Sequence, residues 1–583
     1  MKAFPAFYYR KRSTQTVSVG QVIIGGNSPL CIQSMITAGT MDTEASVQEV
    51  MELAEVGSQI VRITAPTVRE AHNLRVIKSE LVTRGCNVPL VADIHFKSGA
   101  AMEAAKWVEK VRINPGNYAD SKKFSIRGYT DEEYRMELVR VRRLFEPLVA
   151  LCKARGIALR IGVNHGSLSD RIMNRYGDTP LGMVESAMEF ANVARDLGYH
   201  NLVFSMKASS PKMMIAANRL LVARLSEAGL SYPLHLGVTE AGNGEEGRIK
   251  SAIGIGSLLH DGIGDTVRVS LTEDSIHEIH FAKALIDPFL SKENEVPLFE
   301  DFPPSFSYFS YSRRATHRIL IHGIPVGGEE PIRVFTSKER WNVLSQRFPQ
   351  MGECRPEIVL ENSGIKSVDP RDQRAVGLLC EETIPRLVTV ADGIDLSPIS
   401  AFRLLAARIP AYHPILLKDT LFPTLVRHDP LSSLLEASIH IGSLICDGIG
   451  NAVLVQGEQE PERSVRIAYN ILQASGARLS KTDYVACPSC GRTLFNLQQT
   501  TSHVKAATSH LKGVRIAIMG CIVNGPGEMA DADFGYVGGA PGKVNLYVGK
   551  TPVKFNIPEK EAVSCLLDLI RKYGRWADPP LTS

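Results

Sequence analysis

Eight short runs rich in β-forming residues alternate, over the first half of the chain, with amphipathic segments long enough to form helices. The runs are residues 29–35, 60–64, 89–95, 110–114, 158–164, 201–207, 233–239 and 265–271. Eight strands, each followed by a helix or a long loop, are typical of a (β/α)8 or TIM barrel, whose functional groups stand at the carboxyl ends of its strands. The sequence therefore predicts an α/β protein with an N-terminal barrel over residues 1–290.

Polar residues gather at the carboxyl ends of these predicted strands, and many recur two positions apart, which places both members of a pair on one face. They are Arg62 and Thr64, Asp93 and His95, Arg112 and Asn114, Arg160 with Asn164 and His165, Ser205 and Lys207, His235 with Thr239 and Glu240, and Arg268 and Ser270. We expect these side chains to meet at the mouth of the barrel.

The predicted mouth is strongly basic, because four arginines and a lysine converge there with few carboxylates. Any one of these cations could instead point outward or pair with a helix, but burying the whole set is costly unless an anion neutralises it. A phosphorylated ligand fits this mouth. Glu240 is a candidate proton donor, although cationic surroundings favour its ionised form.

A second constraint comes from three cysteines near the C-terminus. Cys487 and Cys490 form a Cys-x-x-Cys pair, and Cys521 follows an apolar, strand-like run at 514–519. Three soft ligands suit zinc or an iron–sulfur cluster. A closed zinc site needs a fourth Cys or His, and although His503 and His510 lie between the thiols, no second pair flanks Cys521. Cys565 falls in a predicted helix over 559–573 and is expected to be a buried structural thiol.

The segment Cys487-Pro-Ser-Cys490-Gly-Arg492, followed by Met519-Gly-Cys521-Ile-Val-Asn-Gly-Pro-Gly-Glu528, resembles the 4-hydroxy-3-methylbut-2-en-1-yl diphosphate synthase family, also called GcpE or IspG. The resemblance extends to barrel segments at 61–64, 92–96, 111–117, 160–164 and 205–207. It implies a 4Fe-4S cluster held by Cys487, Cys490 and Cys521, with Glu528 on the fourth iron. A carboxylate binds soft iron less firmly than thiolate does, so Glu528 can yield to a substrate oxygen.

The resemblance also implies an oxidoreductase of the non-mevalonate (MEP) isoprenoid pathway. Its substrate would be 2-C-methyl-D-erythritol 2,4-cyclodiphosphate, which two one-electron transfers from ferredoxin or flavodoxin convert to 4-hydroxy-3-methylbut-2-enyl diphosphate. Glu240 and Glu528 are the expected catalytic residues. The expected substrate-binding residues are Arg62, Asp93, His95, Arg112, Asn114, Arg160, Asn164, Ser205, Lys207, Thr239, Arg268 and Ser270.

Residues 291–480 separate the barrel from the cysteines, as in the long three-domain form of the family. The stretch 297–311 is rich in Pro, Ser, Phe and Tyr, which indicates a boundary. Segment 441–450 repeats segment 255–264 at most positions, and the strand-like run after it lacks an arginine matching Arg268. We therefore expect a degenerate, barrel-like α/β insert that contacts neither substrate nor iron.

Residues 481–583 are predicted to form a small α+β iron–sulfur domain. The pattern indicates a helix over 494–511, strands at 514–519, 544–548 and 553–555, and a final helix. In the family this domain resembles those of sulfite and nitrite reductases, but the four-cysteine pattern of a sirohaem-coupled cluster is missing.

Composition excludes several classes of function. A net charge of +4, from 66 basic and 62 acidic residues, is too small to indicate a nucleic-acid partner. We expect no membrane span, because apolar runs are short, and no transit peptide, because the basic residues at 8–12 lead directly into a strand-like run. Ten scattered cysteines form no disulfide framework, which favours a bacterial cytoplasm.

Two rival functions stay open from the sequence: a non-catalytic zinc-ribbon scaffold with a phosphate-binding barrel, and a reductase that acts on another phosphorylated ligand. The oligomeric state is also open. In two-domain relatives, the cluster domain of one subunit is understood to cover the barrel of its partner in a homodimer. An insert of about 30–40 Å would also allow the C-terminal domain to close over its own barrel.

Overall fold

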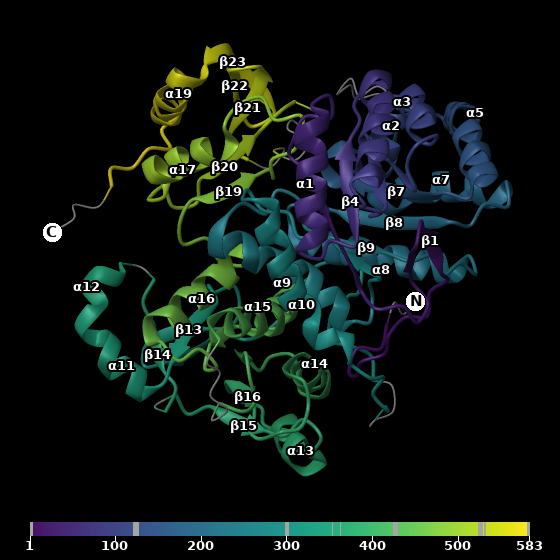
Figure 1. The fold of residues 1–583 in the computed structure, drawn as a ribbon. Coiled ribbons are helices and arrows are strands. Elements are labelled where there is room, and N and C mark those ends of the chain that lie inside the picture. The colour runs from purple at the N-terminus through teal and green to yellow at the C-terminus, as the bar shows by residue number, and fades with distance from the viewer. Residues whose placement is uncertain are drawn as a thin grey trace.

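The structure is a computed structural model that describes residues 4–120, 128–297, 302–352, 354–361, 363–423, 429–522, 529 and 532–579. Its N-terminal part is a parallel barrel surrounded by helices (Figure 1). The strands are β3 (Cys31–Met35), β4 (Ile60–Thr64), β5 (Leu90–Ile94), β6 (Lys110–Ile113), β7 (Ala158–Asn164), β8 (Leu202–Lys207), β9 (His235–Leu236) and β10 (Thr266–Val267). The predicted eight-stranded barrel is confirmed.

The strands follow the order β8-β7-β6-β5-β4-β3-β10-β9, and a parallel bridge between Phe204 and Leu234 brings β8 and the β9 segment together. Strands β9 and β10 are shorter than predicted, because each has only two residues in the ladder of hydrogen bonds. Beyond them the extended chain makes single backbone hydrogen bonds, such as Thr239 N–H to the Ala208 carbonyl at 3.1 Å. The helices around the barrel are α1 (Thr43–Glu55), α2 (Val68–Thr83), α3 (Ser98–Ala104), α5 (Asp131–Arg155), α7 (Pro180–Asp196), α8 (Pro211–Glu227), α9 (Gly244–His260) and α10 (Ser275–Leu290).

A hairpin closes the amino end of the barrel. Strands β1 (Val17–Val19) and β2 (Val22–Ile24) pack Val17, Val19 and Ile24 against residues from the starts of the barrel strands, among them Cys31 and Ile60. Because this end is filled by an apolar cluster, a ligand has access to the barrel interior at the opposite, carboxyl end of the strands.

The middle segment repeats this design incompletely. Its parallel strands are β13 (Arg333–Thr336), β14 (Ile358–Val359), β15 (Lys366–Val368), β16 (Val388–Val390), β17 (Leu416–Lys418) and β18 (Ala452–Leu454). They pair in the order β14-β13-β18-β17, and a bridge from Val388 to Ile415 brings the β15-β16 pair beside β17. A hairpin, β11 (Ile319–Ile321) and β12 (Ile324–Val326), stands where β1 and β2 stand in the barrel, and α13 (Gln373–Glu381), α14 (Pro398–Arg408), α15 (Pro430–Cys446) and α16 (Pro461–Ala474) cover the strands.

The two repeats pack against each other through equivalent residues. Helices α9 and α15 lie side by side, and the Oγ atoms of Ser257 and Ser443 are 2.6 Å apart. A Cβ on Gly256 would stand 2.5 Å from Ile439, and one on Gly442 would stand 2.4 Å from the equivalent isoleucine of α9. Each glycine contacts the isoleucine that is equivalent to the one contacting its counterpart, as expected when a two-fold axis relates two copies of one unit.

The stretch 297–311, in which we predict a boundary, overlaps the start of this repeat. Residues 306–328 follow the pattern of residues 4–26: Phe4 and Phe306 both lie against the guanidinium groups of Arg219 and Arg403. Phe306 is 8% exposed, so the start of the repeat packs into the core.

The C-terminal part is a five-stranded sheet in the order β19-β20-β21-β22-β23, with two helices among the residues that the structure describes (Figure 1). The strands are β19 (Asp483–Ala486), β20 (Arg515–Met519), β21 (Phe534–Ala540), β22 (Lys543–Val548) and β23 (Thr551–Pro558), and the helices are α17 (Leu497–Thr508) and α19 (Glu559–Lys572). Strands β19 and β21 were not predicted. Helix α17 starts three residues later than predicted, because the Asn496 side chain accepts from Gln499 N–H and caps it. Cys565 is partly, not fully, buried.

The C-terminal sheet sits on the carboxyl end of the barrel. Ala241 forms a parallel bridge to Ala486, the Thr272 hydroxyl donates to the carbonyl of Cys487 at 3.1 Å, and Lys250 Nζ lies 3.1 Å from an Asp483 carboxylate oxygen. No helix among the described residues is long and apolar enough to cross a membrane.

Candidate functional site

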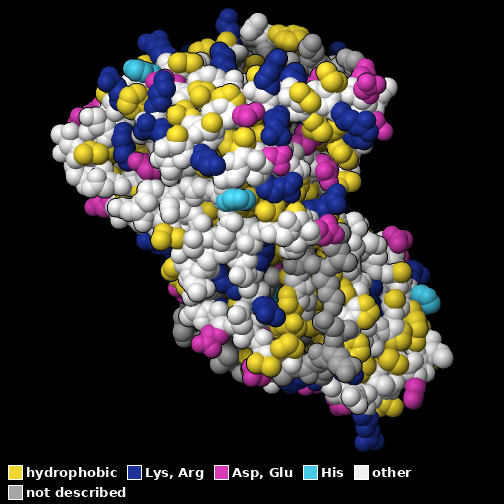
Figure 2. All heavy atoms as spheres, turned by 90° about the vertical axis from the view of Figure 1, so that its right-hand side faces the viewer, with side chains coloured by type: hydrophobic (Ala, Val, Ile, Leu, Met, Phe, Trp, Pro, Cys, Tyr) yellow, Lys and Arg dark blue, Asp and Glu magenta, His cyan; other side chains and the backbone are white. Residues whose placement is uncertain are grey.

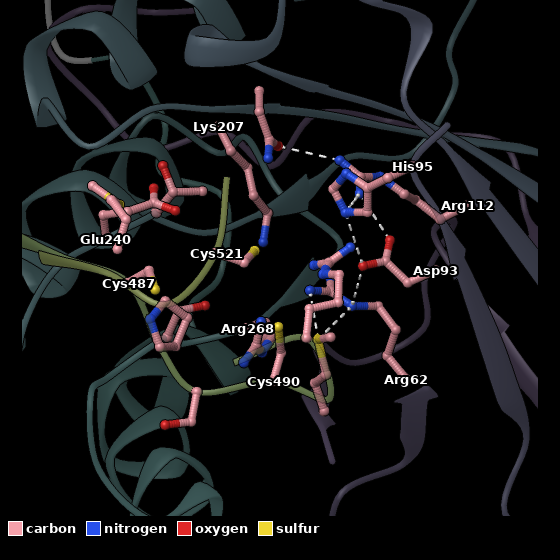
Figure 3. Close-up of a pocket in the computed structure, with 18 of the residues that line it drawn as sticks. Arg62, Asp93, His95, Arg112, Lys207, Glu240, Arg268, Cys487, Cys490 and Cys521 are labelled. Carbon is pink, nitrogen blue, oxygen red and sulfur yellow. Dashed lines mark hydrogen bonds and ion pairs between the residues drawn. The ribbon is translucent and has the colours of Figure 1, made fainter. Parts of the chain in front are cut away.

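The barrel mouth and the cysteine loop line one cavity (Figure 3). Its barrel wall comprises Met35, Arg62, Asp93, His95, Arg112, Arg160, Asn164, Lys207, Thr239, Glu240, Arg268 and Ser270. Its other wall comprises Cys487, Pro488, Ser489, Cys490, Arg492, Met519 and Cys521. Both walls belong to the same chain, so the cysteines face the predicted anion site directly.

Strand register brings the polar side chains together. Asp93 on β5 lies beside Arg112 on β6, which in turn lies beside Arg160 on β7. The Arg112 guanidinium donates to Asp93 Oδ1 at 2.8 Å and to the Gly162 carbonyl at 2.9 Å. A Cβ on Gly162 would stand 2.6 Å from Arg112 Nε, so glycine leaves the room that the guanidinium occupies.

The charges at the barrel mouth determine the protonation states of Asp93 and His95. Burial would raise the pKa of Asp93, but the charges of Arg112 and Arg62 outweigh it and hold that pKa well below its usual range. Burial and the charge of Arg492 lower the pKa of His95 to about 3. Asp93 is therefore an anion and His95 a neutral ring at physiological pH.

Positive charge at the mouth exceeds negative charge. Arg160 and Lys207 are at most 5% exposed, and burial together with the charge of Arg62 lowers both their pKa values. Several buried polar atoms find no hydrogen-bond partner among the described residues: His95 Nδ1, Arg112 Nε, Arg160 Nε and Nη1, Ser205 Oγ and Arg268 Nε. Unsatisfied buried donors of this kind are costly in the absence of a ligand.

On the one face of the outer surface that Figure 2 shows, basic and acidic side chains are interspersed. The cation cluster at the mouth lies inside the cavity, in a chain whose net charge is only +4.

Glu240 lies at the rim between the barrel and the cysteines (Figure 3). Its φ of 50° falls in the left-handed region, where a residue with a Cβ is strained by roughly 1–2 kcal/mol. The Glu240 charge is among the causes that raise the pKa of Cys487, after burial of that thiol and the neighbouring Cys521 and Cys490. Its carboxyl group therefore stands close to the sulfur atoms.

Parallel pairing of β19 with β20 places Cys487 and Cys521 at the same edge of the sheet, because each follows the carboxyl end of its strand. Gly520 N–H donates to Cys487 Sγ at 3.1 Å. Glu528 lies outside the described residues. Among the residues that are described, no three His, Cys, Asp or Glu side chains are grouped closely enough to hold a single metal ion.

Two predicted substrate-binding residues stand outside the cavity wall. The Asn114 side chain accepts from Gly116 N–H at 3.3 Å and caps the short helix α4 (Pro115–Tyr118). Ser205 pairs with Gly162 across β8 and β7. His165 pairs with Asp178 outside the cavity. Arg492 lines the cavity although it was not predicted; its place beside the Cys-x-x-Cys pair was the available signal.

Two domain models of one protein family match this chain, one near each end. The GcpE TIM-barrel domain matches residues 14–283, and the GcpE protein C-terminal domain matches residues 483–572. The chain is 57% identical over 579 residues to the 4-hydroxy-3-methylbut-2-en-1-yl diphosphate synthase (flavodoxin) of Akkermansia muciniphila, covering 98% of both proteins. It is 43% identical to that of Leptospira interrogans, again over 98% of both, and 41% identical to the chloroplastic ferredoxin form of Arabidopsis thaliana, over 98% of this chain and 88% of that protein.

Proposed function

This chain belongs to the 4-hydroxy-3-methylbut-2-en-1-yl diphosphate synthase family, and we propose that it reductively opens 2-C-methyl-D-erythritol 2,4-cyclodiphosphate. The observation that carries the proposal is the single cavity in which buried cations face three cysteines. A doubly charged ring that must receive electrons needs both: cations for its phosphates and an electron carrier at its carbon atoms.

The diphosphate would occupy the barrel mouth. Five cations reach the cavity from different strands, and their geometry allows charge-assisted hydrogen bonds to phosphate oxygens. They are Arg62, Arg112, Arg160, Lys207 and Arg268. The Asp93 carboxylate holds Arg112 at 2.8 Å and lies 3.7 Å from Arg62, so its role is to orient cations and not to touch the anion.

The donor set suits an iron–sulfur cluster. Cys487, Cys490 and Cys521 line one cavity, and a backbone N–H bonded to Cys487 sulfur is a contact that tunes such clusters. A 4Fe-4S cluster with Glu528 as its fourth ligand would supply electrons one at a time. His503 and His510, which could have completed a zinc site, do not line the cavity.

The overall reaction balances with two electrons and two protons. The C2–O bond to phosphate breaks, the C3 hydroxyl takes one proton and leaves as water, the freed phosphate oxygen takes the other proton, and a C2=C3 double bond forms in 4-hydroxy-3-methylbut-2-enyl diphosphate. Glu240, at the rim beside the cysteines, is positioned to deliver a proton to the departing hydroxyl. The electrons would come from flavodoxin or ferredoxin, the donors printed in the names of the relatives.

The insert would take no part in the chemistry. At its strand ends Lys418 is paired with Asp392, and Asp419 accepts from the backbone N–H groups of Gln456 and Gly457 at 2.8 and 3.1 Å. These charges are satisfied internally, unlike those of the barrel mouth. We accordingly propose a substrate domain at 1–290, an inert insert at 291–480 and a cluster domain at 481–583, closed within one chain.

Anaerobic purification tests the proposal. We expect iron with labile sulfide, a visible spectrum that changes on adding the cyclodiphosphate, and turnover with reduced flavodoxin or ferredoxin. Cys521→Ser and Glu528→Ala should lose turnover, whereas Cys380→Ser, which changes an exposed thiol of the insert, should retain cluster and activity. Stoichiometric zinc without iron would support the scaffold alternative, and an iron–sulfur protein that ignores the cyclodiphosphate would support a different phosphorylated substrate.

A further inference from the structure

The barrel wall of the cavity is polar except at Met35. Among the residues of that wall that the structure describes, Met35 alone has a side chain without nitrogen or oxygen. It is 2% exposed. Pro488 and Met519, which are also apolar, belong to the cysteine wall. A ligand held by the barrel cations therefore meets apolar surface on their own wall at Met35.

Two sets of contacts fix Met35 in this wall. It is the last residue of β3 and lies opposite Arg62 of β4 in the parallel register. The Ser275 hydroxyl donates to the Met35 carbonyl at 3.0 Å. Arg62 Nε and Nη2 donate to the Met35 sulfur atom at 3.1 and 3.0 Å. Met35 therefore stands directly beside one of the cations that would hold the diphosphate.

The contact with sulfur leaves Arg62 and Met35 available to a ligand. A thioether is a weak acceptor, whereas phosphate oxygens form charge-assisted hydrogen bonds with a guanidinium. An arriving phosphate group is thus favoured over the sulfur atom as the partner of Arg62. The methyl and methylene carbons of Met35 make no hydrogen bond, and the rotatable bonds of the side chain let them fit the surface of a ligand.

The substrate of the proposed function carries one apolar branch, the methyl group on C2. Because C2 also bears a phosphate oxygen, the methyl group is attached beside the part of the ring that the cations would bind. The hydroxymethyl group on the same carbon can hydrogen-bond to the polar side chains of the mouth, whereas a methyl group placed there would leave buried polar atoms without partners. Contact between the methyl group and Met35 instead removes apolar surface of both from water.

We propose that Met35 receives the methyl branch of the cyclodiphosphate and makes the site selective for the methylated ring. The inference rests on the proposed function, because it takes the cyclodiphosphate as the ligand. It separates the role of Met35 from that of the neighbouring cations, which recognise the phosphates and not the branch. A ring with hydrogen in place of the methyl group would leave a void beside Met35 and lose those contacts.

Titration calorimetry on the anaerobic holoenzyme tests this by deleting the methyl group and the methionine separately. The two ligands are the cyclodiphosphate and erythritol 2,4-cyclodiphosphate, which lacks the 2-C-methyl group. The wild type should prefer the methylated ring by about tenfold or more, since one such group in an apolar pocket is worth roughly 10- to 200-fold. Met35→Ala should bind the methylated ring more weakly and prefer it by no more than about twofold. Met35→Leu, which restores an apolar side chain of similar volume, should keep most of the preference.

Two further methionines serve for comparison. Met136→Ala removes a methionine of α5 that is 65% exposed, and it is the matched control, with wild-type affinity for both rings. Met519→Ala removes the methionine of the cysteine wall and should keep the preference for the methylated ring. Circular dichroism and iron content show whether each variant is folded and loaded. If Met35→Ala does not fold, Met35→Val takes its place, because valine is also shorter and is suited to a strand.

The outcomes separate this inference from the proposed function. If the wild type binds neither ring, the proposed function fails. If the wild type binds both rings equally, or if the shortened Met35 variant keeps the wild-type preference, the role of Met35 is refuted and the proposed function stands. A preference that is lost in Met519→Ala and kept in Met35→Ala would assign the methyl group to the cysteine wall and refute that role as well.

Discussion

Replacing Arg403 with alanine should destabilise the contact between barrel and insert by about 3–5 kcal/mol, the cost of breaking a buried ion pair from one side. Arg403 is 1% exposed and donates to Asp447 Oδ2 at 2.8 Å and to Asp261 Oδ1 at 2.9 Å. Arg219 bonds the same two carboxylates at 2.8 and 2.7 Å. The truncation leaves two buried carboxylates with one guanidinium, and the missing side chain also uncovers the rings of Phe4 and Phe306.

Urea unfolding followed by circular dichroism measures this loss. With a urea dependence of about 3 kcal/mol per molar, the midpoint should fall by about 1 to 1.7 M. Arg347→Ala removes an arginine of the insert that is 56% exposed and paired with Glu462, and should cost less than about 1 kcal/mol.

A charge-balanced variant separates the electrostatic cost from lost packing. Arg403→Met with Asp447→Asn leaves Arg219 paired with Asp261, so it should recover more than half of the stability that Arg403→Ala loses. The reasoning is refuted if Arg403→Ala unfolds at the wild-type midpoint, or if the double variant is as unstable as the single one.

Three further predictions follow from the same geometry. Mixing chains that carry Cys521→Ser with chains that carry Arg112→Ala should restore no activity, because both walls of the cavity come from one chain; recovery in proven hetero-oligomers would show a site shared between subunits. His95 should add no affinity for the cyclodiphosphate on acidification, because its pKa of about 3 keeps the ring neutral through its ordinary pKa of about 6.5; calorimetry that shows a rise in affinity through pH 6.5 in the wild type and no such rise in His95→Gln would contradict this. Gly442→Ala should lower stability by roughly 1–3 kcal/mol through overpacking of α9 against α15. Gly377→Ala, in an open helical position of α13, should not. Equal melting temperatures of the two variants would reject the packing argument.

Much of the barrel could be predicted from the local periodicity of the sequence. Strand runs that alternate with helical segments predict the barrel, and a spacing of two residues at the strand ends predicts that the members of a pair such as Asp93 and His95 share one face of a strand. Both inferences hold because side-chain direction in a strand follows from chain geometry alone. The family could likewise be predicted from the sequence around Cys487, Cys490 and Cys521.

Tertiary structure alone decided which of these residues meet. Asn114 has the same strand-end position as the residues of the cavity wall, yet its side chain is used in capping α4. Arg492 lines the mouth because the cysteine loop packs against the barrel, where a Cβ on Gly491 would stand 2.8 Å from the Ala38 carbonyl oxygen. Segment 306–328 repeats residues 4–26, and only the structure shows the Phe306 ring against Arg219 and Arg403. In each case the deciding contacts join residues far apart in the chain, and local sequence patterns carry no information about the docking of distant segments.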